Sequence, residues 1–117
     1  MSPITVHAPG PDLLPGLRKD QRIEPLVLPD TPLFRCPHCQ ALTAFEAYYP
    51  KVPDPVLPER AAFDKASRSL LSRGCHHRDF ACQGCGRSVR VVYGAFEFVM
   101  SSYLFIPEQV LMGGPRP

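Results

Sequence analysis

Hydrophobic residues alternate with polar ones after residue 86. Val89, Val91 and Tyr93 are apolar at every second position, which is the period of a strand with one buried face. The next apolar stretch, residues 94–106, fits a helix and a strand, but its β-branched and aromatic content favours a strand. We therefore expect residues 94–106 to pair with residues 87–93 around a turn at Gly94, and Pro107 to end the second strand.

A helical period appears in residues 59–73. Apolar residues recur there three and four positions apart, which places them on one face of a helix: Ala62, Phe63, Ala66, Leu70 and Leu71. Pro58 and Glu59 suit the start of a helix, and Gly74 suits its end. The pattern predicts one helix, preceded by a rigid extended connector at residues 50–58 that contains four prolines.

The first 32 residues contain seven prolines and show neither period. Proline removes an amide donor and fixes φ, which disfavours a packed helix or sheet. Leucine, isoleucine and valine are interspersed, so we expect an extended arm that lies along its own domain or along a partner, with a loose terminus as the alternative. Within this Pro-rich arm, residues 26–28 could form a short edge strand.

Two Cys-x-x-Cys pairs stand at residues 36–39 and 82–85. The turn inside each pair directs two sulfur atoms inward, so two pairs together offer four thiolates to one tetrahedral ion. Two pairs in one chain are a strong metal signal, whereas one pair would be weak. We predict that one structural zinc ion is bound by Cys36, Cys39, Cys82 and Cys85.

The flanks of the two pairs resemble each other. Phe34 and Phe80 each precede the first cysteine of a pair by two residues, and strand-prone residues follow both pairs. This order of strand, Cys-x-x-Cys knuckle and strand resembles the zinc ribbon, a small β-fold in which two knuckles hold one zinc ion. The resemblance covers residues 33–45 and 78–93. Gln40 follows the first knuckle, where the family commonly has a glycine such as Gly86.

The resemblance implies a small α+β fold that is mainly β. We expect a zinc-ribbon-like antiparallel sheet with the predicted helix inserted between the knuckles. The 42 residues between the knuckles exceed the family's usual spacing, but the entropy of closing a loop grows slowly with its length. We expect an arm at residues 1–32, a single domain at 33–112 with its connector and helix insertion at 50–74, and a tail at 113–117.

The chain has 117 residues, five cysteines and a net charge of +2. This length indicates one domain with a modest hydrophobic core, which a bound metal ion would help to stabilise. The first residues lack the charged and then apolar pattern of a secretory signal, and the longest apolar run is too short to span a bilayer. We therefore expect a cytoplasmic protein, in which paired thiols bind metal more often than they form disulfides.

Sequence motifs of catalysis are missing. The chain has no phosphate-binding glycine loop, no nucleophile elbow and no paired catalytic carboxylates. A closed four-sulfur shell also leaves zinc no position for a water molecule. We expect a non-enzymatic binding module that acts through another protein, as an adaptor, an assembly component or an inhibitor or immunity-type factor. No membrane partner is expected, and the sequence identifies no small-molecule substrate.

Nucleic acid is an alternative partner. Residues 68–90 contain one acid, Asp79, and five arginines that could form a basic face: Arg68, Arg73, Arg78, Arg87 and Arg90. Phe80 or Tyr93 could stack on bases, and some zinc ribbons act in transcription and translation. The pI of about 8.3 and the presence of only three lysines favour a protein partner instead.

Redox chemistry is a second alternative, because residues 36–39, Cys-Pro-His-Cys, also resemble the active site of thioredoxin-like disulfide oxidoreductases. That resemblance implies a low-pKa Cys36 at a helix N-terminus and a resolving Cys39. The second cysteine pair and the missing βαβ pattern favour metal binding. Cys75, His76 and His77 could add a ligand, but an incidental thiol and two surface imidazoles are the simpler interpretation.

Overall fold

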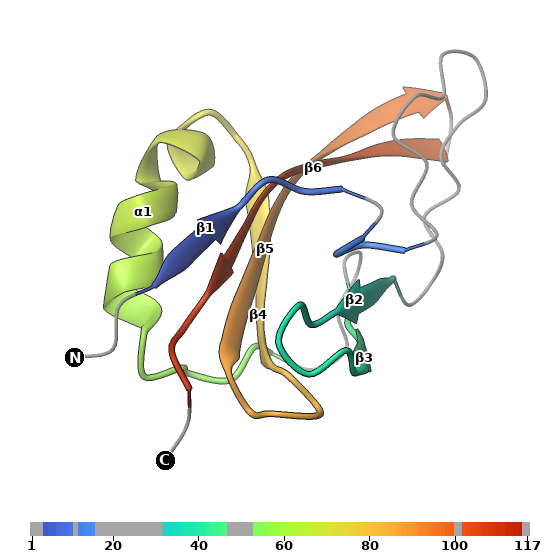
Figure 1. Cartoon of the computed structure of the whole chain (residues 1–117). Helices are drawn as coiled ribbons and strands as arrows, with labels where there is room; N and C mark the ends of the chain where they lie inside the picture. The colour runs from blue at the N-terminus through green and yellow to red at the C-terminus, as the bar shows by residue number, and fades with distance from the viewer. Residues whose placement is uncertain (1–3, 11, 16–31, 47–52, 100–101, 116–117) are drawn as a thin grey trace.

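Six strands and one helix build three layers in this computed structural model, which describes residues 4–10, 12–15, 32–46, 53–99 and 102–115 (Figure 1). The elements are β1 (Thr5–His7), β2 (Leu33–Arg35), β3 (Leu42–Ala44), α1 (Arg60–Ser72), β4 (His76–Ala81), β5 (Ser88–Val99) and β6 (Ser102–Met112). The expected small α+β class, mainly β, is confirmed. The predicted helix at residues 59–73 is also confirmed as α1, and it lies between the two knuckles in the chain.

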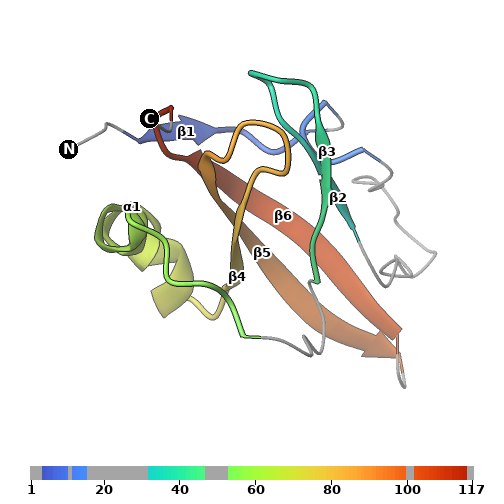
Figure 2. The same ribbon diagram turned by 90° about the horizontal axis from the view of Figure 1, so that it is seen from below.

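The main sheet has the strand order β1-β6-β5-β4, and every pair in it is antiparallel; β2 and β3 form a separate antiparallel hairpin. Viewed from below, α1 and the β2–β3 hairpin lie on opposite faces of the main sheet (Figure 2). Because side chains alternate along a strand, β5 sends Val89 and Val91 to the hairpin side and Arg90 to the helix side. Both faces of β5 are therefore covered at residues 89–91.

The hairpin side of the sheet is an apolar core. Phe80 stacks on Phe45 at 5.1 Å between ring centroids and meets Phe34 edge to face at 5.7 Å. The buried residues of this cluster also include Leu14, Cys36, Cys82, Val89, Val91, Tyr93, Val110 and Met112. Fully burying one large apolar side chain stabilises a fold by about 1.5–3 kcal/mol, so this cluster is a main source of stability.

Helix α1 packs on the other face and ends in a defined capping motif. Phe63 and Ser67 are its buried residues, and Phe63 lies in a cluster with Leu111. After the helix, the amide of Cys75 donates to the carbonyl of Leu70 at 3.2 Å, and the amide of Gly74 donates to that of Leu71 at 3.1 Å. These bonds form a Schellman motif, and it requires the left-handed φ of +94° that Gly74 adopts easily.

The predicted turn at Gly94 and the predicted end at Pro107 are wrong. Strand β5 continues through Gly94 to Val99, and β6 runs through Pro107 to Met112. The register between these strands shifts between Val92 and Tyr93, and Pro107 pairs with Tyr93 at that shift. The ladder is irregular there, so a missing amide donor and a glycine are both tolerated inside long strands.

The N-terminal region contributes to the body of the protein. Residues 5–7, which we expected in an extended arm, pair with residues 110–112 as β1, and Leu14 is buried in the apolar core. The amide of Arg35 in β2 donates to the carbonyl of Leu13 at 2.8 Å. The possible edge strand at residues 26–28 lies outside the described residues.

The connector before α1 covers the outer edge of β4. Asp54 accepts a hydrogen bond from the backbone amide of Asp79 at 3.0 Å, and its carboxylate pairs with Arg78 at 2.7 Å. An uncovered edge strand can pair with another chain, so this contact protects part of the β4 edge.

Candidate metal centre

The two knuckles are built in the same way, as the sequence repeat predicted. The first lies between β2 and β3, and the second lies between β4 and β5. In the first knuckle the amide of Gln40 donates to the carbonyl of Cys36 at 2.9 Å, and in the second the amide of Gly86 donates to that of Cys82 at 2.9 Å. A further equivalent pair of bonds closes each knuckle, from Cys36 N to Ala41 O and from Cys82 N to Arg87 O.

Gln40 adopts the backbone conformation of the glycine at the equivalent place. Its φ is +65°, and the φ of Gly86 is +76°. This region is unfavourable for a residue with a Cβ atom, so the first knuckle holds Gln40 in a conformation that glycine would adopt more readily. The side-chain Nε2 of Gln40 also donates to the carbonyl of Pro37 at 3.3 Å, which supports the turn.

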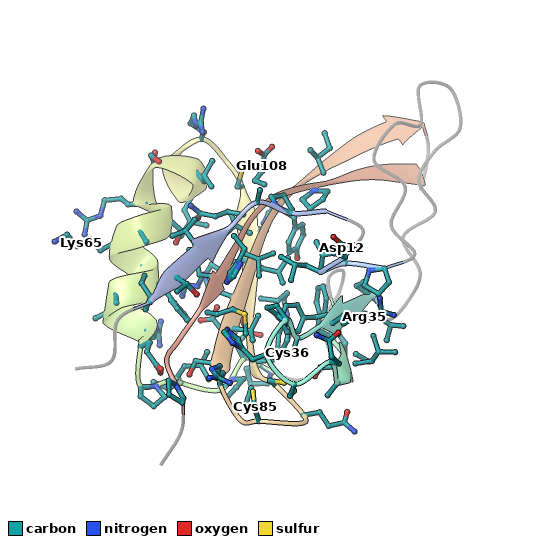
Figure 3. All side chains as sticks on the ribbon, viewed as in Figure 1. Asp12, Arg35, Cys36, Lys65, Cys85 and Glu108 are labelled. Atoms are coloured by element: carbon teal, nitrogen blue, oxygen red, sulfur yellow. The ribbon has the colours of Figure 1, made fainter. Side chains whose placement is uncertain are left out.

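The predicted ligands come together across the two knuckles (Figure 3). The sulfur atoms of Cys36 and Cys85 lie 3.8 Å apart, those of Cys39 and Cys82 lie 3.5 Å apart, and all four lie within 4.8 Å of one another. Cys36 and Cys82 are buried, Cys85 is half-buried and Cys39 is exposed. Four thiols converging from two separate chain segments form a group that could hold a metal ion.

Contacts between the knuckles fix this convergence. A Cβ atom on Gly84 would lie 2.7 Å from the sulfur of Cys39 and 2.7 Å from the Cβ of Ala41, so only glycine fits there without displacement. The amide of Gln83 donates to the Oγ1 of Thr43 at 2.9 Å. Contacts between protein atoms therefore position each knuckle against the other.

The surroundings of Cys36 and Cys85 shift the pKa values of the two thiols in opposite directions. Burial raises the pKa of Cys36 to about 12, so its thiolate is unfavourable unless a cation lies nearby. Burial also disfavours the thiolate of Cys85, but hydrogen bonds from the backbone and side chain of Arg87, and from neighbouring thiols, outweigh it and lower its pKa to about 6. The Nη1 of Arg87 lies 3.4 Å from that sulfur. A metal ion would supply the missing positive charge at Cys36.

The other residues near the predicted site do not join the four-sulfur group. Cys75 is half-buried and lies outside it. The Nδ1 of His77 lies 3.2 Å from the Oδ1 of Asp79, and these two residues form a second potential metal group with Asp54. The carboxylates of Asp79 and Asp54 already pair with arginines, which supply the charge that a second cation would bring.

Of the five arginines in residues 68–90, Arg90 is fully buried against α1. Its guanidinium donates to both carboxylate oxygens of Asp79 at 2.7 and 2.8 Å, to the Oγ of Ser67 at 3.0 Å, and pairs with Asp64 at 2.8 Å. These carboxylates raise the pKa of Arg90 against the effect of burial. Its charge is therefore used inside the protein.

Of the remaining four arginines, two contact acceptors of the protein and two are exposed. Arg78 pairs with Asp54, and Arg87 contacts Cys85, as described above. Arg68 and Arg73 are exposed on α1 and at its C-cap. The structure thus places three of the five guanidinium groups against acceptors of the protein itself.

Several residues of the site were not predicted. Gly84 and Thr43 position the two knuckles against each other, and Gln40 supports the turn of the first knuckle. Arg87 was expected only in a nucleic-acid-binding face. The signal for the left-handed conformation of Gln40 is its correspondence with Gly86 in the second knuckle. The contacts of Gly84 and Thr43 join distant segments and leave no signal in the local sequence.

Cys36 lies in a turn between two strands, not at the helix N-terminus that the oxidoreductase resemblance implies.

Comparisons with protein-family models, with curated proteins and with solved structures found no match to this chain. Among the described residues, no helix is both long and apolar enough to cross a membrane. The function is therefore inferred from the geometry of the residues.

Proposed function

We propose that the four cysteines bind one zinc ion. Zinc binds cysteine sulfur at about 2.3 Å, so two sulfurs of a regular tetrahedron around it lie about 3.8 Å apart. The two sulfur distances of 3.8 and 3.5 Å between the knuckles are close to this edge length. The match between the sulfur distances and a zinc-centred tetrahedron is the observation that carries the proposal. Zinc also suits a donor set of four thiolates.

The zinc ion is structural in this proposal. Four protein ligands fill a tetrahedral shell, so no position is left for a substrate or an activated water molecule. The ion would join the β2–β3 hairpin to the turn between β4 and β5, which lie far apart in the sequence. Its binding energy then becomes folding energy, because the unfolded chain does not hold the four sulfurs together.

The protein as a whole is proposed to be a non-enzymatic binding module for another protein, serving as an adaptor, an assembly component or an inhibitor or immunity-type factor. Outside the four cysteines, the buried charged side chains of the described residues are Asp79 and Arg90, and they bond to each other. A buried charge that is already paired is a structural contact and is not free for acid–base catalysis. Reduced thiols are needed for zinc, so a cytoplasmic location is part of the proposal.

Affinity capture tests the partner class. The tagged full chain, loaded with zinc, is incubated with a nuclease-treated extract of its native host, and Cys75→Ser serves as a matched cysteine control. We expect a defined protein partner to be retained by the wild type and by Cys75→Ser, and lost with Cys82→Ser, which removes a proposed ligand. A partner that is retained from an untreated extract but not from the nuclease-treated extract would contradict the proposal and favour nucleic acid.

A further inference from the structure

We infer that the outer face of α1 binds an acidic segment of the partner protein. This inference rests on the proposed function and specifies the surface that performs it. The outer face consists of Ala61, Lys65, Arg68, Ser69, Ser72 and Arg73, which are all exposed. Figure 3 shows Lys65 pointing away from the body of the protein, on the side of α1 opposite the main sheet.

The cations of this face are not used inside the protein. Within the part of the chain that the structure describes, Lys65, Arg68 and Arg73 make no side-chain hydrogen bond and no ion pair within 4.0 Å. Lys65 and Arg68 are three residues apart, a spacing at which like charges repel on a helix. Arg73 lies at the C-cap, where a cation is favourable, so the repulsion concerns the other two.

The acids near α1 are directed elsewhere. Glu59, at the N-cap, accepts a hydrogen bond from the Oγ of Ser88 at 2.7 Å. Asp64 is the one acid within α1, and its carboxylate pairs with the buried Arg90 at 2.8 Å and with Arg60 at 4.0 Å. Asp64 lies one turn before Arg68 but does not neutralise it. The internal network of Arg90 thereby holds the half-exposed carboxylate of Asp64, and the outer face keeps a net positive charge.

The shape of this face also suits close contact. Its remaining side chains are those of Ala61, Ser69 and Ser72, which are small and leave the cations accessible from outside. At a rise of 1.5 Å per residue, Lys65 and Arg73 are separated by about 12 Å along the helix axis. A short acidic segment can place carboxylates across that distance, and guanidinium groups bind carboxylates in a bidentate manner.

A protein segment fits better than nucleic acid. Three cations can contact at most about three phosphates, so the electrostatic part of nucleic-acid binding, which grows with the number of phosphates contacted, would be small. The outer face has no aromatic residue on which a base could stack. The net charge of the whole chain is +2, so the positive charge of this face is local and suits a local acidic partner.

A peptide-binding assay on the full zinc-loaded chain tests the inference. The probes are a fluorescent peptide of alternating glutamate and serine, the same peptide with glutamine in place of glutamate, and a single-stranded oligonucleotide of similar length. The test variant is Lys65→Ser/Arg68→Ser/Arg73→Ser. The control variant, Lys19→Ser/Arg22→Ser/Lys51→Ser, removes the same number of charges from other parts of the sequence.

At low salt we expect the glutamate peptide to bind the wild type and the control variant within about twofold of each other. The test variant should bind it about tenfold more weakly, and the glutamine peptide should not bind. Equal weakening in the two variants, no binding of the glutamate peptide to the wild type, or tighter binding of the oligonucleotide would overturn the inference. Should the test variant still retain the protein partner in the capture experiment, the inference falls and the proposed function stands.

Discussion

Val89 and Arg90 are neighbours on β5, yet they are buried against opposite layers that are held by different chemistry. On the side of Val89 the sheet packs against aromatic rings and the two knuckles, and four thiols gather at its end. On the side of Arg90 it packs against α1 through a buried guanidinium and two carboxylates. We refer to these as the knuckle face and the helix face.

The two faces differ in the source of the positive charge that compensates their buried anionic groups. The helix face has its own cation, since Arg90 neutralises Asp79 without any ligand. The knuckle face needs a cation from outside, because burial makes the thiolate of Cys36 unfavourable. Stability of the knuckle face should therefore depend on metal, and stability of the helix face should depend on the pairing of Arg90.

The largest effect is expected from Cys82→Ser, which removes one proposed ligand and leaves the others unable to close the shell. Structural zinc binding contributes about 10–16 kcal/mol in small zinc-binding peptides, and an entire domain is stable by only about 5–15 kcal/mol. We therefore expect the melting temperature to fall by more than about 15 °C in a calorimetric scan. Cys75→Ser is the control and should change stability by less than about 0.5 kcal/mol. Equal effects of the two variants would contradict the assignment of ligands.

The next effect is expected on the helix face. Arg90→Ala leaves the buried carboxylate of Asp79 without its partner, and breaking a buried ion pair in this way costs about 3–5 kcal/mol. Denaturant unfolding should measure this loss, while the bound metal per folded chain stays unchanged. The exposed Arg68→Ala is the control and should lie within about 0.5 kcal/mol of the wild type. If Arg90→Ala also released the metal, the two faces would not be independent.

A smaller effect is expected where the knuckles meet. Gly84→Ala introduces a Cβ atom into the space of the Cys39 sulfur, and overpacking of this kind typically costs about 1–3 kcal/mol. Competition with a chelator should show weaker metal binding for this variant. Gly10→Ala is a matched control, because a Cβ atom there meets nothing within 4 Å. Unchanged metal affinity in Gly84→Ala would mean that the knuckles can move apart without cost.

Acid gives the smallest effect. Burial would raise the pKa of Asp79, but hydrogen bonds from Arg90 and His77 outweigh it and lower the pKa below its ordinary value of 3.8. The unfolded chain thus takes up this proton at a higher pH than the folded protein. The stabilisation is present above about pH 4 and is lost as pH falls through the lower folded pKa.

We expect Asp79→Asn to reduce the slope of unfolding free energy against pH below about pH 4, by at most about 1.4 kcal/mol per pH unit. Urea unfolding across the acid range measures it, at the same metal concentration for both proteins because acid also protonates cysteine ligands. A slope identical to that of the wild type would show that Asp79 is not held ionised by Arg90.

The knuckle face could be predicted because its information is local. A Cys-x-x-Cys turn positions two sulfurs wherever it occurs, so two pairs were enough to predict the four-sulfur group. The helix could be predicted for the same reason, since its period and its Gly74 stop lie in one segment. The turn of each knuckle and the helix are thus decided locally, whereas the contacts that bring the two knuckles together are long-range.

The helix face could not be predicted from alternation alone. Between Val89 and Val91, Arg90 is placed on the opposite side of the strand, where a sheet with one open face would expose it to solvent. Helix α1 covers that side, and the pairing of Arg90 with Asp79 depends on the strand register. The turn predicted at Gly94 was wrong because glycine suits a turn and also suits an irregular position inside a long strand.

Native mass spectrometry of the intact, reduced chain weighs the folded protein together with any bound ion, so it counts the metal ions held by the four cysteines. We predict one zinc ion per wild-type chain and per Cys75→Ser chain, and none for Cys82→Ser. A folded wild-type protein without metal, or one that keeps its metal after Cys82→Ser, would contradict the claim that these four sulfurs meet at one ion.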